Sequence, residues 1–221
     1  MDPLNIPIYI TVRDRVSDLR KLVAWLEAAG HQRINLIDND STYGPCCDFL
    51  DHTPHKVYRL SRNLGARALW DAHMVPNEHF IVSDPDLVPI GDCPPDLVER
   101  LVWLLPLSSY GKVGAGLHLD DLPGTLPSLE WERELVAEHR KIVPGAYNSL
   151  VDTTFALYRP GAEFAYEAIR TGYPYQMRHS SWYCDSGNLR DEDRYYLEHA
   201  SSEGPTGSSW KAGLSDGRYD A

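Results

Sequence analysis

The chain is built around the stretch His79-Phe80-Ile81-Val82-Ser83-Asp84-Pro85-Asp86-Leu87-Val88-Pro89. The apolar run over 80–82 predicts a strand that is buried on both faces of a sheet. Asp84 and Asp86 follow this run, and in extended chain residues i and i+2 point to the same side. Pro85 between them lacks an N–H and therefore suits the end of a strand. The stretch predicts a core strand with two carboxylates converging at its carboxyl end.

Two neighbouring carboxylates repel each other, and a hard divalent cation with oxygen ligands relieves that repulsion. Mg²⁺ or Mn²⁺ bound by Asp84 and Asp86 would keep open coordination positions for the phosphates of a substrate. An Asp-Pro-Asp sequence after an apolar run is also typical of an ordinary turn. The pair alone therefore leaves a metal site and a turn as alternative interpretations.

The composition is that of a globular protein with an excess of acidic groups. A chain of 221 residues suffices for one substantial domain, and 43% hydrophobic with 24% charged residues is typical of such domains. The formal net charge of −11 argues against nucleic acid and anionic membranes as general partners. Four cysteines without CxxC spacing predict reduced thiols. Neither a signal peptide nor a membrane-length apolar stretch is recognisable, so we expect a cytoplasmic protein without a transmembrane segment.

Hydrophobic periodicity predicts alternating strands and helices in the first half of the chain. The predicted strands cover 6–12, 34–37, 56–60 and 80–82, and the predicted helices cover 19–30, 66–73 and 96–105. This alternation predicts an α/β domain with a mainly parallel central sheet and helices on both faces. In the second half we expect strands over 113–119 and 153–158 and helices over 129–143 and 163–170.

Charged or amide side chains stand at the carboxyl ends of all four strands predicted in the first half. These ends are residues 13–15, 38–40, 62–63 and 84–86. Ligands of parallel sheets bind at the carboxyl ends of the strands. Each polar cluster alone is compatible with a solvated loop, but together they favour a nucleotide-binding crevice.

In order and spacing, these motifs resemble a GT-A fold glycosyltransferase of the family-2-like group, of the small bacterial type. The resemblance covers nearly all of 6–210. It rests on Ile8-Tyr9-Ile10-Thr11-Val12-Arg13-Asp14-Arg15, Leu36-Ile37-Asp38-Asn39-Asp40-Ser41, Arg62-Asn63-Leu64-Gly65-Ala66, Ser83-Asp84-Pro85-Asp86 and the later segments 151–161 and 178–183. It implies a single Rossmann-like GT-A domain over 1–200, with a donor half at about 1–110 and an acceptor half at about 111–200. A Ser- and Gly-rich tail over 201–221 follows it.

The resemblance implies a metal-dependent enzyme that moves a sugar from a UDP- or GDP-sugar to a hydroxyl acceptor, in surface glycan or glycoconjugate synthesis. Mn²⁺ or Mg²⁺ would bridge the donor diphosphate to the protein. The implied metal ligands are Asp84, Asp86 and a late histidine, His179. The implied donor-binding residues are Thr11, Arg13, Asp38, Asn39, Arg62, Asn63 and Asp84.

The catalytic base stays open at this point. The acidic pair of many inverting relatives and the Gln-x-x-Arg-Trp motif of processive synthases are not recognisable, so polymer synthesis is not expected. Candidates for the base are Asp120, Asp121, Glu132 and Asp152. Asp152 precedes a predicted core strand and Asp121 ends another, which makes these two the preferred candidates. A reaction that retains configuration would need no such base.

Three other functions fit parts of the same pattern. A haloacid-dehalogenase-type phosphatase also carries Asp-x-Asp after a strand, but its fold normally opens with that strand, whereas three strands precede it here. A sugar-nucleotide nucleotidyltransferase shares the sheet and the cation, but the loop over 13–17 has no glycine. A non-catalytic relative would bind a nucleotide or sugar without turnover.

Overall fold

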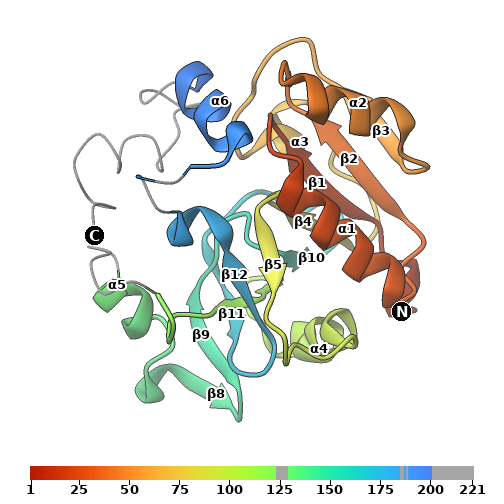
Figure 1. Cartoon of the computed structure of the whole chain (residues 1–221). Coiled ribbons are helices and arrows are strands. Elements are labelled where there is room, and N and C mark those ends of the chain that lie inside the picture. The colour runs from red at the N-terminus through yellow and green to blue at the C-terminus, as the bar shows by residue number, and fades with distance from the viewer. Residues whose placement is uncertain (123–128, 185–186, 188, 201–221) are drawn as a thin grey trace.

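The computed structural model describes residues 1–122, 129–184, 187 and 189–200 (Figure 1). It is an α/β structure with one nine-stranded mixed sheet and one three-stranded sheet. The predicted tail over 201–221 lies outside the described residues. The four cysteines are free thiols, as predicted.

None of the helices in the described part of the chain has both the length and the apolar character needed to cross a bilayer.

Strands and helices alternate in the first half of the chain, which confirms the prediction from hydrophobic periodicity. The elements are η1 (Pro3–Asn5), β1 (Ile8–Val12), α1 (Ser17–Ala28), β2 (Ile34–Asp38), α2 (Gly44–His52), β3 (Lys56–Arg59), α3 (Ala68–Asp71), β4 (Phe80–Ser83), β5 (Leu87–Pro89) and α4 (Leu97–Leu104). Helix α2 was not predicted, although Pro45 in its first turn is a recognised signal for a helix start.

The second half contains more strands than the sequence predicts. Its elements are η2 (Leu105–Leu107), β6 (Lys112–Gly114), β7 (Gly116–Leu117), α5 (Leu129–Glu134), η3 (Glu138–Arg140), β8 (Lys141–Val143), β9 (Ala146–Leu150), β10 (Ala156–Tyr158), β11 (Glu167–Thr171), β12 (Gln176–His179), η4 (Ser180–Tyr183) and α6 (Asp191–His199).

The large sheet is mixed, which corrects the expectation of a mainly parallel one. Its strand order is β3-β2-β1-β4-β10-β6-β11-β9-β8. Strands β3, β2, β1 and β4 are parallel, but β10 runs antiparallel between β4 and β6. Parallel neighbours need a long crossover connection, whereas β8 and β9 are joined by a tight hairpin and pair antiparallel. The continuous run of parallel strands ends at β4, and beyond it β11 is parallel to β6 but antiparallel to β9.

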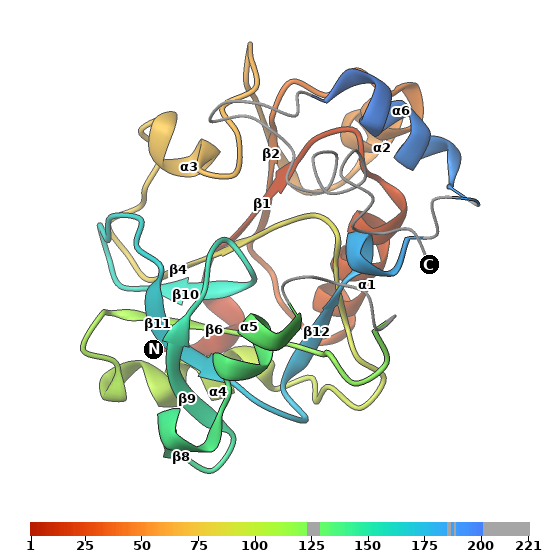
Figure 2. The ribbon, with the colours of Figure 1, turned by 90° about the vertical axis from the view of Figure 1, so that its left-hand side faces the viewer.

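Helices cover both faces of the sheet, as predicted (Figures 1 and 2). On one face, Ile8 and Ile10 of β1 share a buried cluster with residues of α1, α2 and α4. On the other face, Tyr9 and Phe80 pack with Leu69 of α3. The alternation along β1 explains this division, because successive side chains of a strand point to opposite faces. Each fully buried leucine of α1 contributes on the order of 2 kcal/mol by removal from water.

Two of the predicted helices are wrong in whole or in part. The helix predicted over 129–143 ends at Glu134, and its last three residues form β8, which pairs with β9 across a turn at Gly145. Gly145 has a φ of +69°, a conformation that glycine adopts readily. The helix predicted over 163–170 is absent, because residues 167–171 form β11 between β6 and β9.

The predicted strand over 113–119 is divided between the two sheets. Strand β6 belongs to the large sheet, whereas β7 pairs with β12 in the small sheet. Strand β12 also pairs antiparallel with β5, and His179 lies opposite Leu87. The amide of Ser180 donates a hydrogen bond to the carbonyl of Asp86 over 2.8 Å. The small sheet thus brings His179 next to the Asp-Pro-Asp stretch.

Candidate functional site

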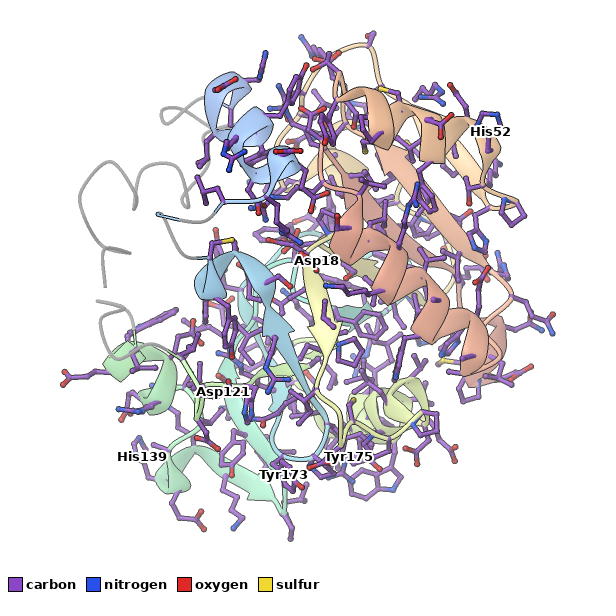
Figure 3. The ribbon with its side chains drawn as sticks, in the orientation of Figure 1. Asp18, His52, Asp121, His139, Tyr173 and Tyr175 are labelled. Atoms are coloured by element: carbon purple, nitrogen blue, oxygen red, sulfur yellow. The ribbon has the colours of Figure 1, made fainter. Side chains whose placement is uncertain are left out.

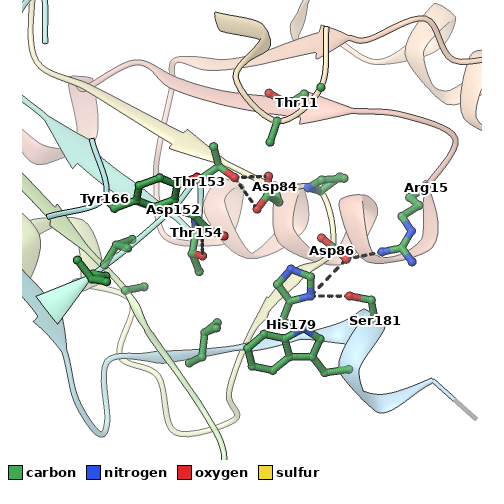
Figure 4. Close-up of a pocket in the computed structure, with 18 of the residues that line it drawn as sticks. Thr11, Arg15, Asp84, Asp86, Asp152, Thr153, Thr154, Tyr166, His179 and Ser181 are labelled. Atoms are coloured by element: carbon green, nitrogen blue, oxygen red, sulfur yellow. Dashed lines mark hydrogen bonds and ion pairs between the residues drawn. The ribbon is translucent and has the colours of Figure 1, made fainter. Parts of the chain in front are cut away.

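A pocket of about 480 Å³ opens beyond the carboxyl end of β4 (Figure 4). We call one part of its wall the β1 side; it includes Thr11, Arg13, Arg15, Asn39, Asn63 and Gly65. We call the opposite part the β11 side; it includes Trp131, Glu132, Leu135, Leu150, Tyr166 and Arg170. Strands β4 and β10 lie between β1 and β11 in the sheet, so Asp84, Asp86 and Asp152 line the middle of the pocket.

Asp84 is a carboxylate that lines the pocket and has no basic partner among the described residues. The Thr153 hydroxyl lies 2.8 and 2.9 Å from its two oxygens. Within residues 1–122, 129–184, 187 and 189–200, no basic side chain lies within ion-pair distance of it. Desolvation raises the pKa of Asp84 well above its ordinary value, and the neighbouring Asp152 and Asp86 raise it further. A bound cation would stabilise the ionised form.

Asp86 stands in the opposite electrostatic environment. It is 5% exposed and forms a buried ion pair with Arg15. The Nδ1 atom of His179 lies 3.5 Å from the same carboxylate oxygen. Burial alone would raise the pKa of Asp86, but His179 and Arg15 outweigh it and the pKa lies below its ordinary value. The two aspartates therefore divide into an open carboxylate and a paired one.

His179 lines the pocket through a ring that its neighbours hold in place. Its imidazole stacks on the indole of Trp182, with centroids 5.2 Å apart and planes inclined by 18°. Its Nδ1 atom also forms a 2.6 Å hydrogen bond with the hydroxyl of Ser181. Figure 4 shows the ring beside Asp86.

The carboxylates in the middle of the pocket are compatible with a hard divalent cation whose remaining coordination positions are filled by the phosphates of a bound substrate. Mg²⁺ and Mn²⁺ prefer oxygen donors and commonly use one or two carboxylates together with substrate phosphates. Asp84 and Asp86 supply such donors. In the described part of the chain, no group of three or more His, Cys, Asp or Glu side chains is placed to hold a metal. His179 as a third ligand therefore stays a prediction.

Asp152 lies on a short loop that is supported from the core. One of its oxygens accepts hydrogen bonds from the amide of Thr154, over 3.0 Å, and from the Thr154 hydroxyl. Beneath the loop, Lys112 is 1% exposed and donates to the carbonyls of Asp152 (2.8 Å), Ala165 (2.7 Å) and Val151. Burial lowers the pKa of Lys112 to about 7. The lysine fixes the backbone that carries Asp152 because each of its ammonium protons meets a carbonyl oxygen.

The predicted donor-binding residues fall into two groups. Thr11, Arg13 and Asn63 line the pocket, and so does Asn39. The Nη1 atom of Arg13 is buried and, among the described residues, has no hydrogen-bond partner. The amide of Asn39 is already engaged, because it donates to the side chain of Asn63 over 2.8 Å and accepts from the backbone of Leu64 over 2.8 Å. Arg13 is thus available to a ligand, whereas Asn39 shapes the loop after β3.

Asp38 and Arg62 are not among the residues that line the pocket. Asp38 is buried and forms an ion pair with Arg59 over 2.7 Å. Its other oxygen accepts a hydrogen bond from the amide of Ser41 over 2.9 Å. Arg62 is exposed to solvent. The structure therefore gives Asp38 a role in holding the loop after β2.

The candidate bases are separated in space. Asp121 lies beside β12, outside the pocket, where it pairs with Arg178 and accepts a hydrogen bond from Tyr183 over 2.8 Å (Figure 3). The hydrogen bond from Arg178 lowers the pKa of Asp121. Asp120 is exposed and does not line the pocket either. Of the four candidates, only Glu132 and Asp152 line the pocket.

Sequence reasoning missed the contribution of α6. Glu192 of this helix accepts hydrogen bonds from the amides of Val16 (3.1 Å) and Ser17 (2.9 Å), and so caps α1 from 175 residues away. Arg190, the residue before α6, pairs with Asp18 of α1 over 2.9 Å, and Figure 3 labels Asp18. The acidic residues at the start of α6 are a recognisable signal for a helix start, but the sequence does not indicate that they contact the start of α1.

Comparisons with protein-family models and with curated proteins found no match for this chain. The candidate site is therefore defined by its geometry: an open carboxylate, a paired carboxylate and a supported loop aspartate between two polar pocket walls.

Proposed function

We propose that this protein is a metal-dependent glycosyltransferase of the GT-A type, which transfers a sugar from a UDP- or GDP-sugar to a hydroxyl acceptor in glycan or glycoconjugate synthesis. The observation that carries the proposal is Asp84. Its carboxylate lies in the middle of the pocket next to Asp86 and Asp152, with a raised pKa and without a basic partner within the described ranges. Such a carboxylate suits a site that a cation completes together with an anionic ligand.

In the proposed reaction, Asp84 and Asp86 would hold Mn²⁺ or Mg²⁺, with His179 as the candidate third ligand. When bound, the cation supplies Lewis-acid stabilisation for the departing nucleoside diphosphate. Arg15 keeps Asp86 ionised and correctly placed, because the buried guanidinium compensates its charge. Thr153 orients Asp84 through its hydroxyl.

The β1 side of the pocket suits the donor nucleotide. Arg13 presents a buried N–H group without a partner among the described side chains, and a planar guanidinium pairs well with phosphate oxygens. The hydroxyl oxygen of Thr11 is also buried and has no hydrogen-bond partner among the described residues. Asn63 lines the wall nearby. These groups supply hydrogen bonds for the diphosphate and ribose.

Asp152 is the proposed general base. Its Oδ1 atom is engaged by Thr154, which leaves Oδ2 to accept a proton from the acceptor hydroxyl. The acceptor oxygen then forms the new bond to the sugar while the bond from the sugar to the diphosphate oxygen breaks. Asp121 is not part of this proposal because it lies outside the pocket and pairs with Arg178.

Calorimetry with UDP and GDP, with and without Mn²⁺, tests donor binding directly. We expect one nucleotide to bind only with the cation and to raise the apparent stability by mass action. Release of nucleoside diphosphate from the matching sugar nucleotide would then show turnover. Release of pyrophosphate would indicate a nucleotidyltransferase, and binding without turnover a non-catalytic relative. Unchanged nucleotide affinity in Asp84→Asn would contradict the proposal.

A further inference from the structure

The β11 side of the pocket carries two exposed aromatic rings. Trp131 of α5 is 53% exposed, and Tyr166, which precedes β11, is 57% exposed. Both line the pocket. Large aromatic side chains are normally packed, and an exposed pair within a concave site marks a binding surface. Their flat apolar faces with polar edges suit a ligand that is itself apolar on one face and polar at its rim.

A buried ion pair lines the same side of the pocket as these rings. Glu132 and Arg170 are 7% and 4% exposed, and their charged atoms are 2.7 Å apart. The Nε atom of Arg170 is buried and has no hydrogen-bond partner among the described residues. A buried donor without a partner is costly, and a ligand oxygen would satisfy it. This wall therefore offers a hydrogen-bond donor in addition to the aromatic faces.

The pair also determines which charge this wall accepts. Glu132 compensates Arg170, so neither charge is free to bind an ion of opposite sign. An anionic group would meet the carboxylate of Glu132, and a purely hydrocarbon ligand would leave Arg170 Nε unsatisfied. An uncharged ligand with hydroxyl groups satisfies the donor without an uncompensated charge.

We propose that the β11 side binds an uncharged pyranose ring of the acceptor, with the ring against Trp131 and Tyr166 and its hydroxyls toward Glu132 and Arg170. This inference rests on the proposed transferase function. Val151 donates a backbone hydrogen bond to Tyr166 over 2.7 Å, which ties the aromatic wall to the Asp152 loop. In Figure 4, Tyr166 lies beside Asp152 and Thr153. A ring on this wall therefore stands next to the proposed base.

The test measures binding of simple glycosides to the full chain by ligand-observed NMR, without donor or metal. The probes are the methyl pyranosides of glucose, galactose and mannose, with methyl glucuronide as the charged comparison. We expect at least one uncharged glycoside to bind and to lose about tenfold in affinity in Trp131→Ala and Tyr166→Ala. Trp103→Ala and Tyr110→Ala are matched controls, because these residues are 55% and 48% exposed outside the pocket.

Charge selectivity supplies the second readout. Glu132→Gln leaves Arg170 uncompensated, so we expect the preference for the uncharged glycoside over glucuronide to shift by about tenfold toward the anion. Absence of glycoside binding, unchanged affinity in Trp131→Ala, or unchanged selectivity in a folded Glu132→Gln would overturn the proposal.

The same measurements distinguish this proposal from the transferase proposal. Glycoside binding should survive in Asp84→Asn, since that residue belongs to the donor and metal part of the site. Glycoside binding without turnover of any sugar nucleotide would refute the proposed transferase function but support a sugar-binding site on the β11 side. Turnover with an acceptor that has no pyranose ring, together with no glycoside binding, would refute the proposed pyranose site on the β11 side but not the transferase function.

Discussion

The guanidinium of Arg15 and the carboxylate of Asp86 form a buried ion pair between residues 71 positions apart in the sequence. Each side chain is 7% exposed. The pair joins the loop after β1 to the Asp-Pro-Asp stretch, and His179 approaches the same carboxylate from β12. Because Arg15 pairs with Asp86, Asp84 and Asp152 are the aspartates of the pocket that have no basic side chain within ion-pair distance among the described residues.

Replacing Arg15 by Met removes the partner of a buried carboxylate. We expect the free energy of unfolding at pH 7 to fall by about 3–5 kcal/mol, since an uncompensated buried charge is strongly destabilising. Urea denaturation measures this change.

Arg13→Met is the matched control, because Arg13 lies in the same loop and its nearest acidic group is 3.8 Å away. We expect that variant to lose less than about 1 kcal/mol of stability but to bind UDP or GDP more weakly. Equal losses of stability would contradict this division of roles.

Asp84→Asn should separate stability from ligand binding. A raised pKa means that the folded protein binds the Asp84 proton more tightly than the unfolded chain does. The stability that Asp84 contributes is therefore present at low pH and is lost as the pH rises above the ordinary value of 3.8. At pH 7 the neutral Asn relieves this cost, so we expect an equal or higher Tm in calorimetry together with loss of Mn²⁺-dependent nucleotide binding. A lower Tm with intact binding would show that Asp84 is a structural group.

Asp152→Asn and Asp121→Asn distinguish the two candidate bases. We expect Asp152→Asn to lower turnover by about a hundredfold or more with donor affinity unchanged, because a general base acts on the acceptor hydroxyl. Asp121→Asn should keep near wild-type turnover, since Asp121 lies outside the pocket and pairs with Arg178. Steady-state kinetics with saturating donor measures both. The reverse ranking would return the role of base to Asp121.

Lys112 should give the protein a measurable dependence of stability on pH. Its pKa is about 7 in the folded protein against an ordinary value of 10.5, so between these values the unfolded chain binds more protons. The free energy of unfolding should therefore increase with pH in this window, with a Lys112 contribution of up to about 1.4 kcal/mol per pH unit. Lys112→Met should remove that contribution, whereas Lys56→Met, at an exposed site on β3, should not. Parallel pH profiles of wild type and Lys112→Met in urea denaturation would refute this role.

Local patterns predicted most elements of the first half of the fold, although α2 and β5 were missed. The apolar runs of β1, β2 and β4, the helical spacing of Leu19, Leu22 and Leu26, and the Asp84–Asp86 pair are all readable from short stretches of sequence. These features depend on the side-chain periods of strands and helices, which the chain carries within itself. The position of the pocket at the strand ends followed from them as well.

Contacts between residues far apart in the sequence determined the second half of the fold and the partners of the site residues. Strand β11 forms because β6 and β9 pair with it on both sides, although residues 163–170 taken alone resemble a helix. The sequence by itself determined which residue types stand at the strand ends. Only the tertiary structure decided that Asp86 meets Arg15, that Asp38 meets Arg59, and that Asp84 remains open. The physical reason is that the state of a charge depends on its burial and on its nearest partner in space, and that partner comes from elsewhere in the chain.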